Sequence, residues 1–119
     1  MYKVKCHCNK IEIEINQPKL FENLVRCNCS ICSKRATVMA IVNENSVNVI
    51  KGSEFLKLYQ FHTNTAKHYF CSECGIYTHH QTRKDITKYG INVYCVDGIE
   101  SIKLENIRES DGKNHPLDK

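Results

Sequence analysis

The sequence of 119 residues has no apolar run that could cross a membrane as a helix, which would take about 20 consecutive apolar residues. Its start, Met1-Tyr2-Lys3-Val4-Lys5, alternates like a β-strand. It contains neither the apolar core of a signal peptide nor an amphipathic transit segment. We therefore expect a soluble intracellular protein, located in the cytoplasm, with no membrane partner.

Long blocks of lysine and arginine are also absent, and so are internal repeats. The formal net charge is +4, from 17 Lys and Arg against 13 Asp and Glu. Binding of nucleic acid needs a concentrated basic face, which scattered residues such as Lys3, Lys5 and Lys10 do not provide. The charge pattern thus argues against a nucleic-acid partner, and the length and 41% hydrophobic content suit one domain with a single core.

Cysteine, in contrast, is abundant, with seven of the eight cysteines in three short clusters. The clusters are Cys6-His7-Cys8, Cys27-Asn28-Cys29-Ser30-Ile31-Cys32 and Cys71-Ser72-Glu73-Cys74. An exported chain could use eight cysteines for four disulfides, but C-x-C and C-x-x-C spacings are typical of metal or redox chemistry in a reducing compartment. Zn²⁺ takes four such ligands at a structural site, and three plus an exchangeable partner at a catalytic site.

Seven thiolates divide naturally into a closed four-sulfur site and an open three-sulfur site. The pairs around residues 7 and 72 would share one ion and tie the N-terminus to the second half of the chain. The triplet is local and can leave one coordination position free. Alternate side chains of a strand share a face, which would bring Cys6 near Cys8 and Cys27 near Cys29. With Zn²⁺ bound, the four-thiolate site would carry a charge of −2 and the three-thiolate site a charge of −1. The formal net charge of the protein would then fall from +4 to +1.

The hydrophobic pattern has mostly a period of two and predicts a mainly-β fold of roughly eight short strands, in two packed antiparallel sheets or a half-open barrel. The clearest strand is Ile11-Glu12-Ile13-Glu14-Ile15. Other strands are expected at residues 36–42, 47–50, 55–61, 67–70, 76–81 and 89–96, with single helical turns at 30–34 and 84–88. Residues 1–108 are expected to form one zinc-binding domain, and residues 109–119 a polar C-terminal tail.

The order of these motifs resembles a known family. The motifs are C-x-C near the N-terminus, C-x-C-x-x-C some twenty residues later, Lys51-Gly52 before the aromatic strand Phe55 to Tyr59, Phe70-Cys71-Ser72-Glu73-Cys74-Gly75, and Val93-Tyr94-Cys95-Val96-Asp97. Together they resemble the glutathione-dependent formaldehyde-activating enzyme and centromere protein V family over residues 2 to 105. Asn9 stands where that family usually has glycine, and asparagine tolerates a left-handed turn.

The resemblance implies an Mss4-like fold with two Zn²⁺ ions and a carbon-sulfur lyase or synthase activity that joins a thiol, such as glutathione, to formaldehyde. The implied structural zinc lies on Cys6, Cys8, Cys71 and Cys74, and the catalytic zinc on Cys27, Cys29 and Cys32. Lys34 and Arg35 are candidates for binding the carboxylates of the thiol substrate, although a solvated basic pair is an equally good interpretation.

Some alternatives stay open. Cys95 is either a buried small hydrophobe or a fourth ligand that closes the triplet site. One of four histidines, His62, His68, His79 or His80, could act as a proton shuttle, and the adjacent His79 and His80 should face opposite ways. The rival function is a non-catalytic, zinc-stabilised module that binds a protein or nucleic acid. A redox role for Cys71 and Cys74 lacks the βαβ context that such motifs need.

Overall fold

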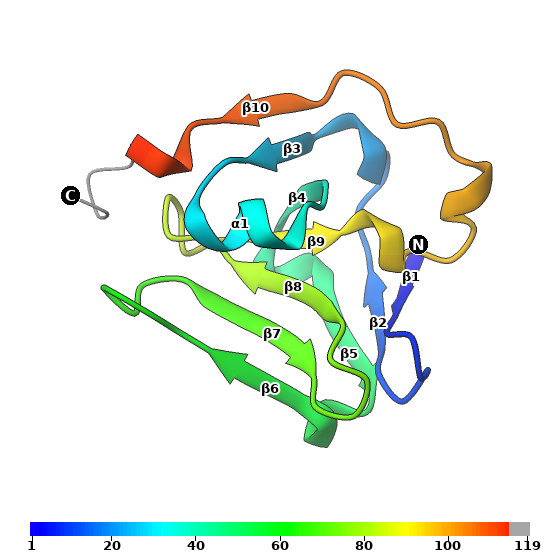
Figure 1. Ribbon diagram of the computed structural model, residues 1–119. Coiled ribbons are helices and arrows are strands. Elements are labelled where there is room, and N and C mark those ends of the chain that lie inside the picture. Colours follow the sequence, from blue (N-terminus) through cyan, green and yellow to red (C-terminus); the bar gives the residue numbers. More distant parts are fainter. Residues whose placement is uncertain (115–119) are drawn as a thin grey trace.

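The computed structural model describes residues 1–114, which fold into two β-sheets and one short α-helix (Figure 1). The smaller sheet is antiparallel and has the order β1-β2-β5, with β1 at Tyr2–Lys5, β2 at Glu12–Ile15 and β5 at Val47–Lys51. The larger sheet has the order β10-β3-β4-β9-β8-β7-β6. Its strands are β10 (Arg108–Ser110), β3 (Leu24–Cys27), β4 (Met39–Asn43), β9 (Lys88–Asn92), β8 (Tyr77–Gln81), β7 (Lys67–Cys71) and β6 (Leu56–Tyr59). The predicted mainly-β fold with two sheets is confirmed.

The alternating isoleucines of the N-terminal half form the centre of the core. Ile11, Ile13 and Ile15 are each 0% exposed and pack in one cluster with residues of the larger sheet, such as Leu24 and Ile91. Burying each isoleucine contributes about 1.5–3 kcal/mol to folding. A shift of β2 by one residue would turn all these side chains to solvent, so the pattern fixes its register.

Neither C-x-C pair lies on one strand, which corrects the geometric argument from the sequence. β1 ends at Lys5, just before Cys6, and β3 ends at Cys27. Cys29 instead stands at the N-cap of the helix α1 (Ser30–Arg35), where its sulfur accepts a hydrogen bond from the backbone N–H of Cys32. The sulfurs are therefore brought together by turns and a helix start, not by strand alternation.

Two further local predictions are wrong. Cys95 lies in a 3₁₀ turn, Val93–Cys95, because the Asn92 side chain accepts a hydrogen bond from the backbone N–H of Tyr94 and ends β9. The helical turn expected at 84–88 is a tight loop between β8 and β9. Its last residue, Lys88, already belongs to β9 and donates its backbone N–H to the Asp85 carbonyl.

The boundary expected at residue 108 falls inside β10. This strand runs parallel to β3, with Glu109 opposite Arg26 and Ser110 opposite Cys27 (Figure 1). A 3₁₀ turn, Gly112–Asn114, follows. Residues 109–114 thus lie against the domain, and the rest of the predicted tail, residues 115–119, lies outside the described residues.

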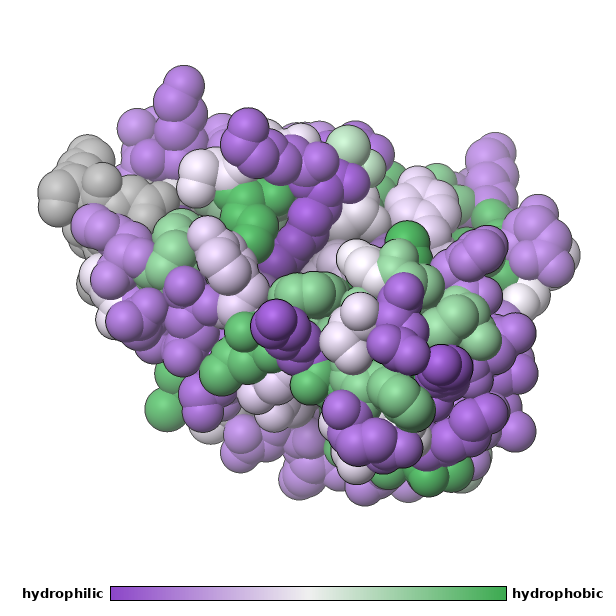
Figure 2. All heavy atoms as spheres, turned by 60° about the horizontal axis from the view of Figure 1, so that its bottom comes forward, coloured by the Kyte–Doolittle hydropathy of each residue, from purple (hydrophilic) through white to green (hydrophobic). Residues whose placement is uncertain are grey.

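Figure 2 shows the face at the bottom of Figure 1, where hydrophilic side chains surround scattered hydrophobic ones. Among the exposed large hydrophobic residues of the chain are Val49 and Ile50 on β5, and Leu58 and Tyr59 on β6. Within residues 1–114, no helix has the length and apolar character needed to cross a membrane.

Candidate metal centres and the adjoining pocket

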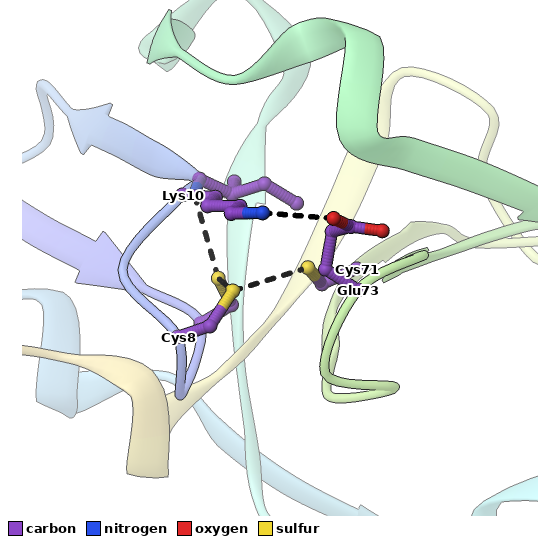
Figure 3. A network of polar contacts seen from close by, with 6 residues as sticks. Cys8, Lys10, Cys71 and Glu73 are labelled. Carbon is purple, nitrogen blue, oxygen red and sulfur yellow. Dashed lines mark hydrogen bonds and ion pairs between the residues drawn. The ribbon is translucent and has the colours of Figure 1, made fainter.

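The first candidate metal centre joins Cys6, Cys8, Cys71 and Cys74, whose sulfur atoms all lie within 4.8 Å of one another. The Cys8 sulfur is 3.6 Å from that of Cys6 and 3.7 Å from that of Cys71 (Figure 3). Tetrahedral Zn–S bonds of about 2.3 Å hold sulfur atoms about 3.8 Å apart, so the donor set and its spacing fit Zn²⁺. The fold brings the two remote pairs together as the spacing predicted.

Left-handed backbone at two positions allows the loops to curl around this centre. Asn9 has a φ of 63° and Gly75 a φ of 79°, a region open to glycine and tolerated by asparagine. The backbone N–H of Gly75 donates to the Cys71 carbonyl at 2.8 Å and closes the C-x-x-C turn. Next to the sulfurs, Lys10 Nζ donates to Glu73 Oε1 at 2.8 Å and links the two loops (Figure 3).

The second candidate centre holds Cys27, Cys29 and Cys32, whose sulfur atoms also lie within 4.8 Å of one another. Cys27 comes from the end of β3, while Cys29 and Cys32 come from the first turn of α1. Within residues 1–114, no Cys, His, Asp or Glu supplies a fourth ligand atom to this group. Three thiolates and a free position are the donor set of an open zinc site.

Two thiols of this group, those of Cys27 and Cys32, have pKa values displaced in opposite directions. Hydrogen bonds from the thiols of Cys29 and Cys32 hold the pKa of Cys27 far below its usual range. The pKa of Cys32 is raised by its hydrogen bonds with Cys27 and Cys29 and by burial. Cys27 therefore exists as the thiolate that a metal requires before Cys32 does.

The three cysteines line a pocket of about 730 Å³, which is within the usual range of about 300–1,000 Å³ for small-molecule sites. Apolar side chains next to the cysteines, such as Ile31 and Met39, form part of its wall, and His68 and His80 come from β7 and β8. Its charged lining residues are Arg83, Lys84, Asp85, Lys88 and Arg108. Four cations against one carboxylate favour a ligand with net negative charge.

His80 is held firmly in this pocket wall. Its Nδ1 lies 2.6 Å from the Tyr77 hydroxyl, and its ring stacks on His68 with centroids 5.1 Å apart. Gly90 makes room for the ring, because a Cβ there would lie 2.7 Å from His80 Cε1 and 2.8 Å from Met39 Sδ. Burial, followed by the nearby charges of His68 and Arg35, lowers the pKa of His80 well below 6.5, so the imidazole is neutral at pH 7.

Arg35 contacts both His68 and Tyr77. Its guanidinium carbon is 3.7 Å from the centroid of the Tyr77 ring, and its Nη2 is 2.6 Å from His68 Nδ1. Since arginine can only donate, His68 Nδ1 accepts and its proton sits on Nε2. Arg35 lines a neighbouring pocket of about 330 Å³, whereas Lys34 is exposed and lines neither pocket. Their role in substrate binding stays a prediction.

Cys95 belongs to neither sulfur group. Its sulfur lies 3.6 Å from the Tyr77 carbonyl, and burial, with smaller contributions from Cys6 and Cys74, raises its pKa to about 12. Two of the candidate histidines are also outside the large pocket. His62 is exposed, and His79 stacks on Tyr69 away from His80, so the two adjacent histidines have different neighbours, as expected.

Sequence reasoning missed part of the pocket. Arg83 and Lys84 carried a signal, since they form a basic pair two residues after the end of the strand that holds His79 and His80. Arg108 and Gly112 carried none, because they lie in or next to the segment interpreted as a tail.

The fold and the two sulfur groups define a class, a small mainly-β domain with two cysteine centres suited to metal, one closed by four sulfurs and one with three beside a pocket. Residues 1–109 match the family model described as glutathione-dependent formaldehyde-activating enzyme, so the chain belongs to this family. The chain is also similar to a Rhodobacter sphaeroides protein of known crystal structure. The identity is 40%, the match covers 91% of this chain and 99% of that one, and the TM-score is 0.82. The resemblance stated from the motifs is confirmed.

Proposed function

We propose that this protein is a zinc-dependent carbon-sulfur lyase or synthase that interconverts a thiol plus formaldehyde and the S-hydroxymethyl thiol, with glutathione as the thiol. The observation that carries the proposal is the three-sulfur group of Cys27, Cys29 and Cys32, which lines a substrate-sized pocket. Family membership supports glutathione and formaldehyde as the reactants. The four-sulfur group would hold a structural Zn²⁺ and the three-sulfur group a catalytic one.

Bound Zn²⁺ would supply a Lewis-acid position that lowers the pKa of an incoming thiol below about 8.5, its value for a free cysteine. The three cysteines hold that position at the pocket wall. In the synthase direction a bond forms between sulfur and the formaldehyde carbon, and the carbonyl electron pair moves to oxygen. The proton lost by the thiol ends on that oxygen. The lyase direction breaks the same S–C bond.

The charged lining suits glutathione, which carries two carboxylates and one ammonium group at neutral pH. Lys84 is exposed and lines the pocket, so it can reach a carboxylate without leaving a buried partner unpaired. Lys34 and Arg35, two and three residues after Cys32, are further candidates for this role. His80 would donate a hydrogen bond to the oxygen of the electrophile, because its neutral ring is fixed in the pocket wall by Tyr77.

The proposal is tested by mixing the zinc-loaded protein with glutathione and ¹³C-formaldehyde and following the S-hydroxymethyl adduct by exchange NMR. We expect interconversion above the uncatalysed rate, lost in Cys29→Ser and kept in the matched variant Cys95→Ala. A folded, zinc-loaded protein that leaves the exchange rate unchanged would refute the activity. An unchanged exchange rate is what the rival, non-catalytic binding module would give, so this assay separates the two classes of function.

A further inference from the structure

The end of β10 and the turn that follows it contact the three-sulfur group directly. We call these residues, 110–114, the C-terminal strap. β10 lies beside β3 and brings the strap to the end of β3, where Cys27 stands (Figure 1). The family match ends at residue 109, so the strap lies beyond the part of the chain that the family model describes.

Asn28, the residue between Cys27 and Cys29, tethers the strap with three hydrogen bonds. Its backbone N–H donates to the Ser110 carbonyl at 3.1 Å. Its side-chain Nδ2 donates to Asp111 Oδ1 at 3.0 Å, and its Oδ1 accepts from the backbone N–H of Lys113 at 2.9 Å. Both ends of the strap are thus held by Asn28, whose two neighbours in the chain are candidate metal ligands.

Gly112 lies at the point of closest approach. It is buried, and a Cβ added there would lie 2.5 Å from Cys27 Sγ and 2.8 Å from Cys29 Cβ. Its carbonyl accepts a hydrogen bond of 2.7 Å from Arg83 Nη2. Any side chain at position 112 would force the strap or the cysteines to move, so only glycine fits there.

We propose that the strap is the outer shell of the three-sulfur site, with Gly112 as a positioning residue for Cys27, so that metal binding there and docking of the strap stabilise each other. Backbone and side-chain donors around ligating groups orient them and strengthen metal binding. Coupling of this kind is reciprocal, since each event changes the equilibrium of the other by the same factor. The inference rests on the proposed function only in placing a zinc ion on Cys27, Cys29 and Cys32.

The test measures zinc release from the full-length, zinc-loaded protein to a chromophoric chelator, with the four-sulfur site as internal control. The phase that disappears in Cys29→Ser identifies release from the three-sulfur site. We expect Gly112→Ala to accelerate that phase by roughly 10- to 100-fold, the usual effect of losing an outer-shell partner. The phase from the four-sulfur site should not change. Unchanged release from both sites would overturn the proposal.

Asp111→Ala provides a second variant that adds no atom beside the sulfurs. It removes the acceptor of the Asn28 and Asn114 side chains from an exposed position, and it should accelerate the same phase in the same direction. Glu109→Ala is the matched control, because this exposed β10 side chain pairs only with Arg26 among the described residues. Equal acceleration of both phases by Gly112→Ala and Asp111→Ala would indicate general destabilisation and contradict the coupling.

Hydrogen exchange measures the reciprocal effect. The backbone N–H of Lys113, bonded to Asn28, should be protected in the zinc-loaded protein and lose this protection in Cys29→Ser. Equal protection in both would contradict the proposal. These measurements do not use thiol chemistry, so an inactive protein with a coupled strap would refute only the proposed activity, and an active protein without coupling would refute only the strap.

Discussion

The Cys8 sulfur lies 3.7 Å from the Cys71 sulfur, although 63 positions separate the two residues in the chain. Cys8 lies in the loop after β1 and Cys71 ends β7, so the contact joins the smaller sheet to the larger one. A metal ion bound by these sulfurs would close the long loop of chain between Cys8 and Cys71. The three-sulfur group instead spans six residues of one local segment, and the two centres should therefore respond differently to loss of a ligand.

Cys71→Ser should destabilise the domain far more than Cys29→Ser. Cys71 is 0% exposed, and its loss would remove a ligand from a metal that contributes folding free energy directly. We expect a loss above about 4 kcal/mol, in the exceptional range for a point mutant. Cys29→Ser should keep the fold and lose activity. Thermal unfolding with and without a chelator measures the stability of both variants. Equal destabilisation of the two would contradict the assignment of one structural and one open site.

Cys95→Ala should retain both zinc ions, since the Cys95 sulfur belongs to neither group and lies 3.6 Å from the Tyr77 carbonyl. The expected cost is about 1 kcal/mol, typical of a substitution that removes few contacts. Native mass spectrometry counts the metals. A variant that loses one zinc would show that Cys95 closes the three-sulfur site and would count against the enzyme.

Lys84→Ala should raise the KM for glutathione several-fold while kcat stays close to its original value, because binding of a distant carboxylate contributes equally to the ground state and the transition state. Lys34→Ala tests the sequence-based prediction at a matched exposed lysine. If only Lys34→Ala raises KM, the carboxylate binds at the end of α1 and not on the loop between β8 and β9.

His80→Gln should lower kcat more than it raises KM, since the proposed hydrogen bond strengthens as charge develops on the oxygen. Tyr77→Phe removes the hydroxyl that lies 2.6 Å from His80 Nδ1 and should reproduce part of this effect. ¹⁵N NMR of the ring gives the tautomer, which we expect to carry its proton on Nε2 in the original protein. Unaltered kcat in both variants would remove His80 from the mechanism.

Stability should fall as the pH is lowered from about 6.5 to about 4. Burial lowers the pKa of His79 to about 4, against 6.5 for an ordinary histidine. Between these values the unfolded chain binds a proton that the folded protein does not, so the free energy of unfolding rises with pH by up to about 1.4 kcal/mol per unit. Denaturant titrations should show a shallower slope in His79→Gln. Parallel slopes would mean that His79 is not neutral in the folded protein.

Much of the fold was predictable because the signals are local. The isoleucines at 11, 13 and 15, in β2 and just before it, alternate over five residues, and a period of two has one structural solution when one face is buried. The grouping of Cys27, Cys29 and Cys32 was equally local. Yet the reason given for it was wrong, because strand alternation and the start of a helix both bring closely spaced cysteines together, and only the backbone shows which one operates.

The sequence by itself determined the two candidate sulfur groups, since the spacing of seven cysteines limits which sulfurs can meet. The tertiary structure alone decided what surrounds them. His80 reaches the pocket through the register of β8 against β9, where it stands opposite Gly90. Gly112 reaches Cys27 through the parallel pairing of β10 with β3. Both contacts join segments far apart in the chain, and no short-range pattern records such pairings because they depend on how whole strands order themselves in the sheet.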